Sequence, residues 1–272
     1  MVMTENDDPT VVDLDSGPDA LNAAAALALK SDPVPDPVPP DTTVNLPGGL
    51  INLHGQLIDT AEVQELNGED EEFLAKEKGS DTVPKIITSI LCRGVVQLGD
   101  FPLNRTTFNS LLVGDRLALY IGIRRATYGN DVPLSLICPV CNTTFAVAVE
   151  LHDLEVRQME DRTKRTFEVS LRHGGVAEVR LMTGDVHEAM EEAKIAAEQN
   201  TIVLSKTITK LNGSQIIDKA AVLRLGSMDR RNIIKALSDN QPGPILEGIK
   251  VPCSACGEVR EITLSVIDLF RT

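Results

Sequence analysis

The sequence predicts an α+β fold in which a mostly helical body carries a four-cysteine zinc ribbon made of two β-hairpins that are distant in sequence. Two CxxC motifs, Cys138 with Cys141 and Cys253 with Cys256, open two similar segments. Apolar residues alternate with period two on both sides of each motif, which is typical of strands with one buried face. Longer apolar stretches between residues 83 and 126 have helical spacing instead.

The two segments form an internal repeat. Asp153-Leu154 follows Cys141 by twelve positions, and Asp268-Leu269 follows Cys256 by the same twelve. The apolar residues between these points share their offsets: Val147, Val149 and Leu151 in the first copy, Ile262, Leu264 and Val266 in the second. Each copy is therefore predicted to be a hairpin with its CxxC motif at the tip.

A structural zinc site needs four soft ligands in a tetrahedron, and each CxxC turn supplies two of them. We expect one Zn²⁺ per chain, with these ligands: Cys138, Cys141, Cys253 and Cys256. The residue after the second cysteine of such a turn often has positive φ, which Gly257 adopts freely and Asn142 tolerates. Both positions therefore favour metal binding.

The cysteines also admit other roles. Disulfides are disfavoured because the chain begins without a basic and then apolar leader, and a redox CxxC would be a single pair. Thiols that merely pack in the core remain an alternative. Catalytic zinc is disfavoured because four cysteines leave no open coordination position. The fifth cysteine, Cys92, is interpreted as a small core residue.

Composition limits the class of protein. The chain has 272 residues, 42% of them hydrophobic, and no apolar run approaches the ~20 residues of a membrane span. We expect a soluble protein with no membrane contact. Its net charge is -14, of which residues 1–45 carry nine acids and one lysine, or -8, leaving -6 for the rest. The acidity is therefore concentrated in an N-terminal arm.

Composition and turn-forming residues divide the chain into five predicted parts. Residues 1–45 are a proline-rich, acidic arm, disordered or extended, in which only residues 20–29 suggest a short helix. Residues 46–132 form an N-terminal hairpin and helical region. The first zinc-ribbon hairpin spans 133–156 and the second 248–272, so residues 157–247 are a strand-helix insertion between them.

The predicted elements follow from local patterns. Before the first CxxC motif they are a hairpin at 50–59, helices at 69–78 and 83–98, and an apolar stretch at 108–126 broken at Gly114-Asp115, with Asp115 as a cap. In the insertion they are paired strands at 168–181, a helix from Asp185 to about residue 200 with Asp185 and Glu188 as a capping box, an ambiguous segment at 201–211, and helices at 218–225 and 227–237.

No catalytic site is predicted. The chain lacks a phosphate-binding GxxxxGK, a GxGxxG after a strand, and a histidine pair at i, i+4. Each histidine is interpreted as non-catalytic: His54, His152, His173 and His187. We therefore predict that the protein is not an enzyme and has neither a small-molecule substrate nor a further cofactor.

The alternative function is that of a zinc-ribbon nucleic-acid-binding or regulatory protein. Binding to a phosphate backbone requires clustered Lys and Arg, whereas the isoelectric point is about 4.7. The local basic pairs are small: Arg124-Arg125 and Arg230-Arg231. The first pair lies on an otherwise apolar predicted helix, where a solvated or snorkelling position is expected. Charge thus disfavours nucleic acid as a partner.

Several short motifs occur in a characteristic order and spacing: Leu46-Pro47-Gly48-Gly49, the run from Glu65 to Glu71, Ile123-Arg124, Thr127-Tyr128-Gly129, the first CxxC, Asp153-Leu154-Glu155-Val156 and the second CxxC with Gly257. In these motifs the chain resembles a known family, the tail baseplate hub assembly proteins of T-even-like contractile bacteriophages. Two features depart from the family pattern, namely Asn142 in place of glycine and the acidic, proline-rich arm.

This resemblance implies a structural or assembly component of a phage tail baseplate. Its partners would be other baseplate, hub or tail-tube proteins, and its location would be the virion tail after assembly in the host cytoplasm. A metal-stiffened β-module beside apolar helices suits an adaptor of fixed shape. The motifs do not distinguish a permanent component from an assembly factor.

Overall fold

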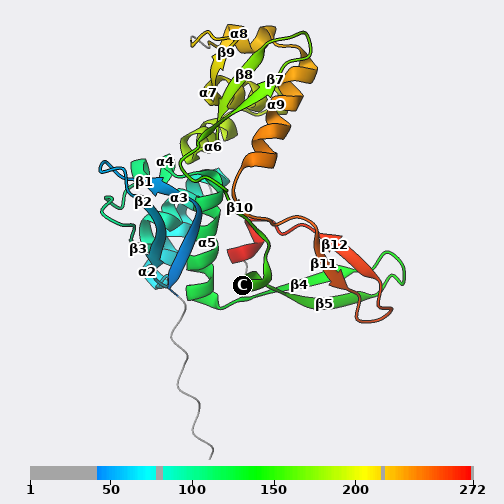
Figure 1. Ribbon diagram of the computed structural model, residues 1–272. Helices are drawn as coiled ribbons and strands as arrows, with labels where there is room; N and C mark the ends of the chain where they lie inside the picture. The colour runs from blue at the N-terminus through cyan, green and yellow to red at the C-terminus, as the bar shows by residue number, and fades with distance from the viewer. Residues whose placement is uncertain (1–41, 78–81, 216–217, 271–272) are drawn as a thin grey trace, which may run out of the picture. The chain divides into compact units, whose positions relative to one another are not determined.

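The computed structural model describes residues 42–77, 82–215 and 218–270, all within one compact unit of residues 40–272 (Figure 1). Of the acidic arm expected at residues 1–45, the part up to residue 41, including the short helix, lies outside these residues, whereas residues 43–45 belong to a strand. Within the described chain 40% of residues are helical and 28% are in strands. The α+β class is confirmed, but "mostly helical" is wrong, because strands occur in every part of the fold.

An antiparallel three-stranded sheet begins the described chain, with the order β1 (Thr43–Ile51), β2 (Leu57–Val63) and β3 (Val95–Gln97). The predicted hairpin at 50–59 is confirmed and is longer than expected, since β1 already starts at Thr43. Asn52 shapes its turn, because its side-chain oxygen accepts from the backbone N–H groups of His54 and Gln56 at 3.0 and 2.9 Å.

Four helices complete the body: α2 (Gly68–Glu77), α3 (Val83–Gly94), α4 (Arg105–Ser110) and α5 (Val113–Tyr128). The helix expected at 83–98 ends at Gly94, and the β-branched pair after it joins β2 as β3. The break between α4 and α5 lies at Leu111-Leu112 and not at Gly114-Asp115. Asp115 is not a cap, because it lies buried within α5.

Helix α5 runs through the main core, where eleven of its sixteen residues are buried. Strand β1 crosses it closely at Gly122, where an added Cβ would lie 2.2 Å from Val44. The same core extends to the bases of both CxxC hairpins through Val132, Val149, Val251 and Leu264. The body and the hairpins therefore share one hydrophobic core.

Residues 166–240, here called the inserted module, have a separate core. Its antiparallel sheet has the order β7 (Thr166–Ser170), β8 (Val176–Arg180) and β9 (Ile208–Leu211), and its helices are α6 (Gly184–Glu191), α7 (Ala196–Thr207), α8 (Lys219–Arg224) and α9 (Ser227–Asn240). The strands and the last two helices agree with the prediction. The single helix expected from Asp185 is two helices, and the ambiguous segment is the end of α7 followed by β9.

The inserted module begins and ends at neighbouring points. Strand β6 (Val156–Arg157) pairs antiparallel with β10 (Gly243–Pro244), so the incoming and outgoing chains run side by side. Helix α5 meets them at Gly114, where an added Cβ would lie 1.6 Å from the carbonyl oxygen of Pro242. The two ends of the insertion are therefore held together by this strand pair and by its contact with α5.

Candidate metal centre

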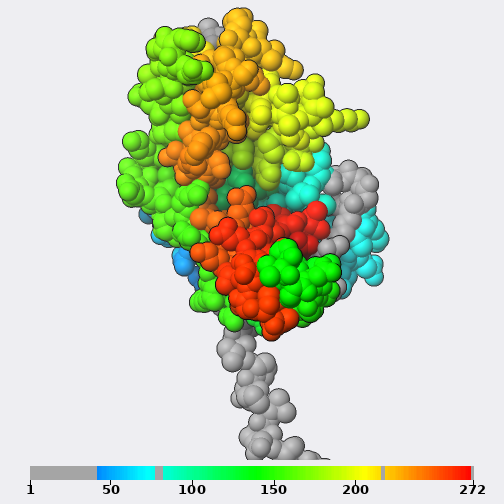
Figure 2. Space-filling model, turned by 90° about the vertical axis from the view of Figure 1, so that its right-hand side faces the viewer, coloured from blue at the N-terminus to red at the C-terminus, as the bar shows by residue number. Residues whose placement is uncertain are grey.

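Two hairpins bring the CxxC motifs together. The first consists of β4 (Asp131–Ile137) and β5 (Thr144–Glu150), and the second of β11 (Ile249–Pro252) and β12 (Val259–Ile262). Both are antiparallel, with the cysteines in the connecting turns. The tips of the hairpins, green and red, lie side by side in Figure 2. The predicted pairing of hairpins distant in sequence is thus present.

The two turns have the same backbone structure. The N–H of Asn142 donates to the carbonyl of Cys138, and that of Gly257 to the carbonyl of Cys253, both at 2.8 Å. Asn142 and Gly257 have φ of 54° and 75°, as their residue types predicted. The internal repeat therefore extends to the conformation of the turns.

The four sulfur atoms have the spacing of a metal site. All lie within 4.8 Å of one another, with 3.7 Å between Cys138 and Cys256 and 3.8 Å between Cys141 and Cys253. A zinc ion with Zn–S distances of ~2.3 Å in a tetrahedron would place its sulfurs about 3.8 Å apart. A disulfide would need ~2.05 Å. The donor set therefore fits a tetrahedral, thiolate-bound ion.

The surroundings differ between the two cysteines of each turn. Cys138 and Cys253 are buried against Phe145, while Cys141 and Cys256 lie at the surface. Arg260 of the second hairpin also donates to the carbonyl of Ile137 in the first. A protein contact thus supplements the sulfur cluster in joining the hairpins.

The cysteine thiols affect one another's protonation. Hydrogen bonds from Thr143 lower the pKa of Cys141 to about 6. The amide of Glu258 acts in the same direction on Cys256, but desolvation and the neighbouring thiols outweigh it and raise the pKa of Cys256 to about 12. A bound cation would stabilise the thiolate form of every ligand, because metal binding releases thiol protons.

A short 3₁₀ turn follows each hairpin and contains the repeated aspartate, η1 (Leu151–Asp153) after the first and η2 (Asp268–Phe270) after the second. Asn130 fastens η1, since its backbone carbonyl accepts from the N–H of Leu151 at 3.1 Å and its side chain accepts from that of His152 at 2.8 Å. The twelve-residue spacing therefore marks the point where each hairpin is attached to the body.

Arg124 fastens η2, a role that sequence reasoning missed. The expectation that Arg124 is solvated or snorkelling is wrong, because its exposed fraction is 3%. Its guanidinium donates to the carbonyls of Leu269 at 2.8 Å, Asp131 at 2.6 Å and Gly129. The sequence did contain a signal for this role, because Arg124 lies in a run of apolar helical residues. An arginine that is buried in such a helix must find hydrogen-bond acceptors.

The other candidate residues lie apart from the sulfur cluster. Cys92 is half-buried against the main core, and burial raises the pKa of its thiol, as expected for a core residue. Burial also lowers the pKa of His187 to about 4. Within the described ranges the four cysteines are the one group of three or more His, Cys, Asp or Glu with metal-binding spacing.

Comparisons with known proteins give one family. A family model described as T4 bacteriophage base plate protein matches residues 59–270, a range that includes both hairpins and the inserted module. No curated protein and no solved structure matches significantly. Among the described helices, none has the length and apolar character needed to cross a membrane.

Proposed function

Because the chain belongs to the T4 bacteriophage base plate protein family, we propose that it is a structural or assembly component of the tail baseplate whose shape depends on one bound Zn²⁺. The family is a structural one of the phage tail, which points to a location in the virion tail and to a non-enzymatic role. The observation that carries the zinc part of the proposal is the spacing of the four sulfurs.

Cys138, Cys141, Cys253 and Cys256 would hold the ion. When bound, zinc supplies a cross-link between segments that are 112 and 118 residues apart at the contacting sulfur pairs. Such a link stabilises the fold because the free energy of metal binding adds to that of folding. In theory the stabilisation is largest for links that close long loops. Four sulfurs also complete a tetrahedral shell, so the site has a structural role and leaves no position for substrate.

We further propose that the partners are other baseplate, hub or tail-tube proteins. Two short, metal-linked hairpins fixed to a helical core offer a surface of defined shape, and preorganised surfaces lose less entropy on binding. The chain would be made in the host cytoplasm and incorporated into, or used to build, the tail.

The two basic pairs give little support to the alternative that the protein binds nucleic acid. The guanidinium of Arg124 is taken up by three backbone carbonyls. Arg230 donates to the carbonyl of Val222 at 3.1 Å and to the hydroxyl of Thr201 at 2.7 Å. One arginine of each pair is therefore committed to the fold, and what remains is small for a phosphate-binding surface.

Two measurements test this proposal. Elemental analysis of the reduced, purified chain should find about one zinc per chain, and absence of metal would overturn the zinc assignment.

Deleting the chain from the phage should stop tail assembly at the baseplate stage, as seen by electron microscopy. Normal tails after deletion would overturn the assembly role. Mass spectrometry of purified tails then separates a permanent component from an assembly factor.

A further inference from the structure

The two hairpins of the metal centre differ at one pair of equivalent positions. Ser135 and Ala146 are cross-strand partners in the first hairpin. Aligning the CxxC motifs places Lys250 and Glu261 at the same positions of the second, where they too are cross-strand partners. All four residues are exposed. A pair of opposite charges thus corresponds to a pair of small, uncharged residues.

The contrast extends over the first hairpin from Val132 to Val149. Residues 132–149 contain no Asp, Glu, Lys, Arg or His, whereas residues 249–262 contain Lys250, Glu258, Arg260 and Glu261. The outer face of the first hairpin, as we call the exposed strand residues between Val132 and Val149, consists of Pro133, Ser135, Ile137, Thr144, Ala146 and Ala148. This face is uncharged, and the exposed cross-strand pair Asp131 and Glu150 lies outside it, at the base of the hairpin.

Large apolar side chains are exposed at the end of this face. Ile137 is 59% exposed at the end of β4, and Val140, between the two cysteines, is 68% exposed. The core does not use them, because the alternate residues of the same strands, such as Val132, Phe145 and Val149, are the buried ones. The hairpin thus presents one face to the protein core and a second, uncharged face to its surroundings.

An exposed two-stranded hairpin of this kind is exceptional among solvated surfaces. Strands that stay in water usually bear charges, since a charged side chain prevents pairing with other chains. The second hairpin follows that rule with its Lys250–Glu261 pair. Because both hairpins have the same turn and register, the fold does not require the first to be uncharged. The difference indicates that a partner covers it.

We propose that the outer face of the first hairpin is an interface, and that its occupant is an uncharged apolar surface on a different baseplate protein. The inference rests on the proposed function, which supplies the class of partner. A charged partner surface would be desolvated there without a counter-charge, which is costly. The partner's contact surface is therefore uncharged as well.

The size of the face distinguishes such a partner from a second copy of this chain. The face takes five residues of each strand, 133–137 and 144–148, so it covers about 17 Å by 10 Å, or roughly 170 Å². A stable dimer needs about 800 Å² per partner. The face is too small to hold two copies together by itself, and it suits one contact among several within a larger assembly.

A reciprocal transplant of the charged pair tests this inference. The variant Ser135→Lys with Ala146→Glu places the pair of the second hairpin on the first, and it keeps the net charge. The matched control, Lys250→Ser with Glu261→Ala, removes the pair from the second hairpin. Each arrangement already exists at the equivalent place in the same chain, so both variants should fold, bind about one zinc and keep the oligomeric state of the wild type.

Each variant is expressed in cells infected with phage that lacks the chain, and completed tails are counted. We expect the charged first hairpin to reduce complete tails at least tenfold, and the control to give wild-type numbers. Wild-type numbers with the charged first hairpin overturn the interface while leaving the proposed function intact. Failure of the deletion itself to affect tails overturns both.

A photo-reactive amino acid at position 135 identifies the occupant. In wild-type assembly reactions we expect a cross-link to a different tail protein, and the same label at position 250 should give at least tenfold less of it. A cross-link between two copies of this chain, or none in completed or stalled tails, overturns the assignment of the occupant.

Discussion

The metal module, which comprises residues 131–153 and 249–270, and the inserted module are held in place by different means. Four sulfurs within 4.8 Å of one another join the two halves of the metal module. The inserted module is instead joined to the body by hydrogen bonds around Arg116, which is 1% exposed. The sulfur cluster thus joins two hairpins that share the core of the body, whereas the inserted module has a separate core and is joined to the body by buried polar groups.

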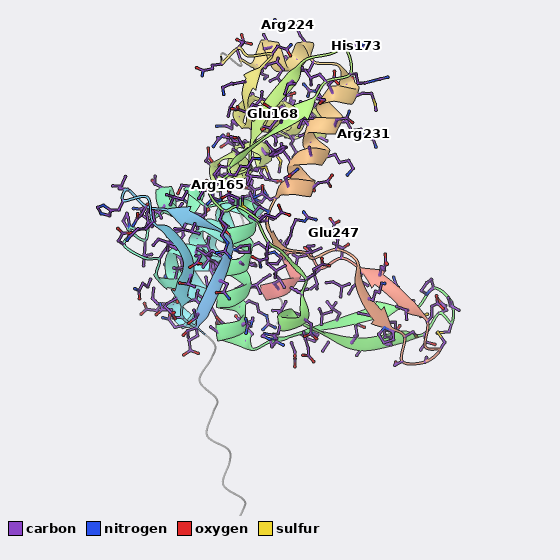
Figure 3. All side chains as sticks on the ribbon, viewed as in Figure 1. Arg165, Glu168, His173, Arg224, Arg231 and Glu247 are labelled. Atoms are coloured by element: carbon purple, nitrogen blue, oxygen red, sulfur yellow. The ribbon has the colours of Figure 1, made fainter. Side chains whose placement is uncertain are left out.

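Arg116 donates to Asn109 at 2.6 Å and to the Pro84 carbonyl at 2.9 Å in the body. Glu188 of α6 accepts from the hydroxyl of Thr88 at 2.5 Å and from the side chain of Asn109 at 3.0 Å. Nearby, Arg165 donates to the Gly48 and Gly49 carbonyls at 2.9 Å, and Figure 3 labels it just before β7. The two modules should therefore respond to different treatments.

Removal of metal should have the largest effect and should be confined to the metal module. Replacing Cys138 and Cys256 by Ser should reduce zinc from about one per chain to none. Because structural zinc contributes up to ~10–16 kcal/mol in small peptides, we expect several kcal/mol of lost stability here. Hydrogen exchange should accelerate in β4, β5, β11 and β12, while β8 and α7 stay protected. Equal loss in both modules would contradict the distinction.

Removal of Arg116 should affect the other attachment. Arg116→Met removes the buried guanidinium that donates to Asn109, to the Pro84 carbonyl and to the hydroxyl of Thr88, which should cost about 3 kcal/mol. Exchange should accelerate in α3 and α6, and zinc content should stay at about one per chain. Arg231→Met, at an exposed position on α9, is the control and should change neither. Loss of zinc from the Arg116 variant would show that the attachments are coupled.

The stability of the region where the inserted module joins the body should depend on pH through Asp115. Burial raises the pKa of this carboxyl to about 6, although the amides of Gly48 and Gly49 and the charges of Arg165 and Arg162 oppose the rise. The folded chain then binds a proton between pH 4 and 6 that the unfolded chain lacks, so this group's contribution to stability falls as pH rises through that window. The change is on the order of 3 kcal/mol.

Denaturant unfolding of the wild type and of Asp115→Asn at pH 4 to 7 measures this contribution. The wild type should lose stability relative to the variant as the pH rises, and the difference should level off above pH 6. A difference that does not change with pH would show that Asp115 has the same pKa in both states.

The smallest effect is expected from the two CxxC turns. Gly257→Ala places a Cβ at φ of 75° and should cost ~1 kcal/mol, whereas Asn142→Gly at φ of 54° should stabilise by less than that. The thermal midpoint of the zinc-loaded chain should fall with the first change and rise slightly with the second. Opposite shifts would mean that the turns are not equivalent when metal is bound.

Local patterns in the sequence were sufficient to predict the cluster of four cysteines. The CxxC spacing, the alternation beside it and a residue tolerant of positive φ after each second cysteine predict two hairpin tips with four sulfurs. The number of residues between the two motifs did not affect this prediction. Each motif supplies two of the four ligands, so the two can be paired without predicting the structure of the chain between them. The strands β7 and β8 and the helices α8 and α9 were likewise predictable from their own periodicity, whereas the division between α6 and α7 and the strand β9 were not.

Only the tertiary structure decided the roles of residues whose partners are distant. Arg124 and Arg116 could be taken for surface charges on an apolar helix until Leu269 and Glu188 were placed beside them. The helix from Val83 ends at Gly94 because a free strand edge is available there. The uncharged face of the first hairpin is informative because its inner face is already buried in the core. Sequence spacing encodes neighbours along the chain, whereas burial depends on contacts between segments brought together by folding.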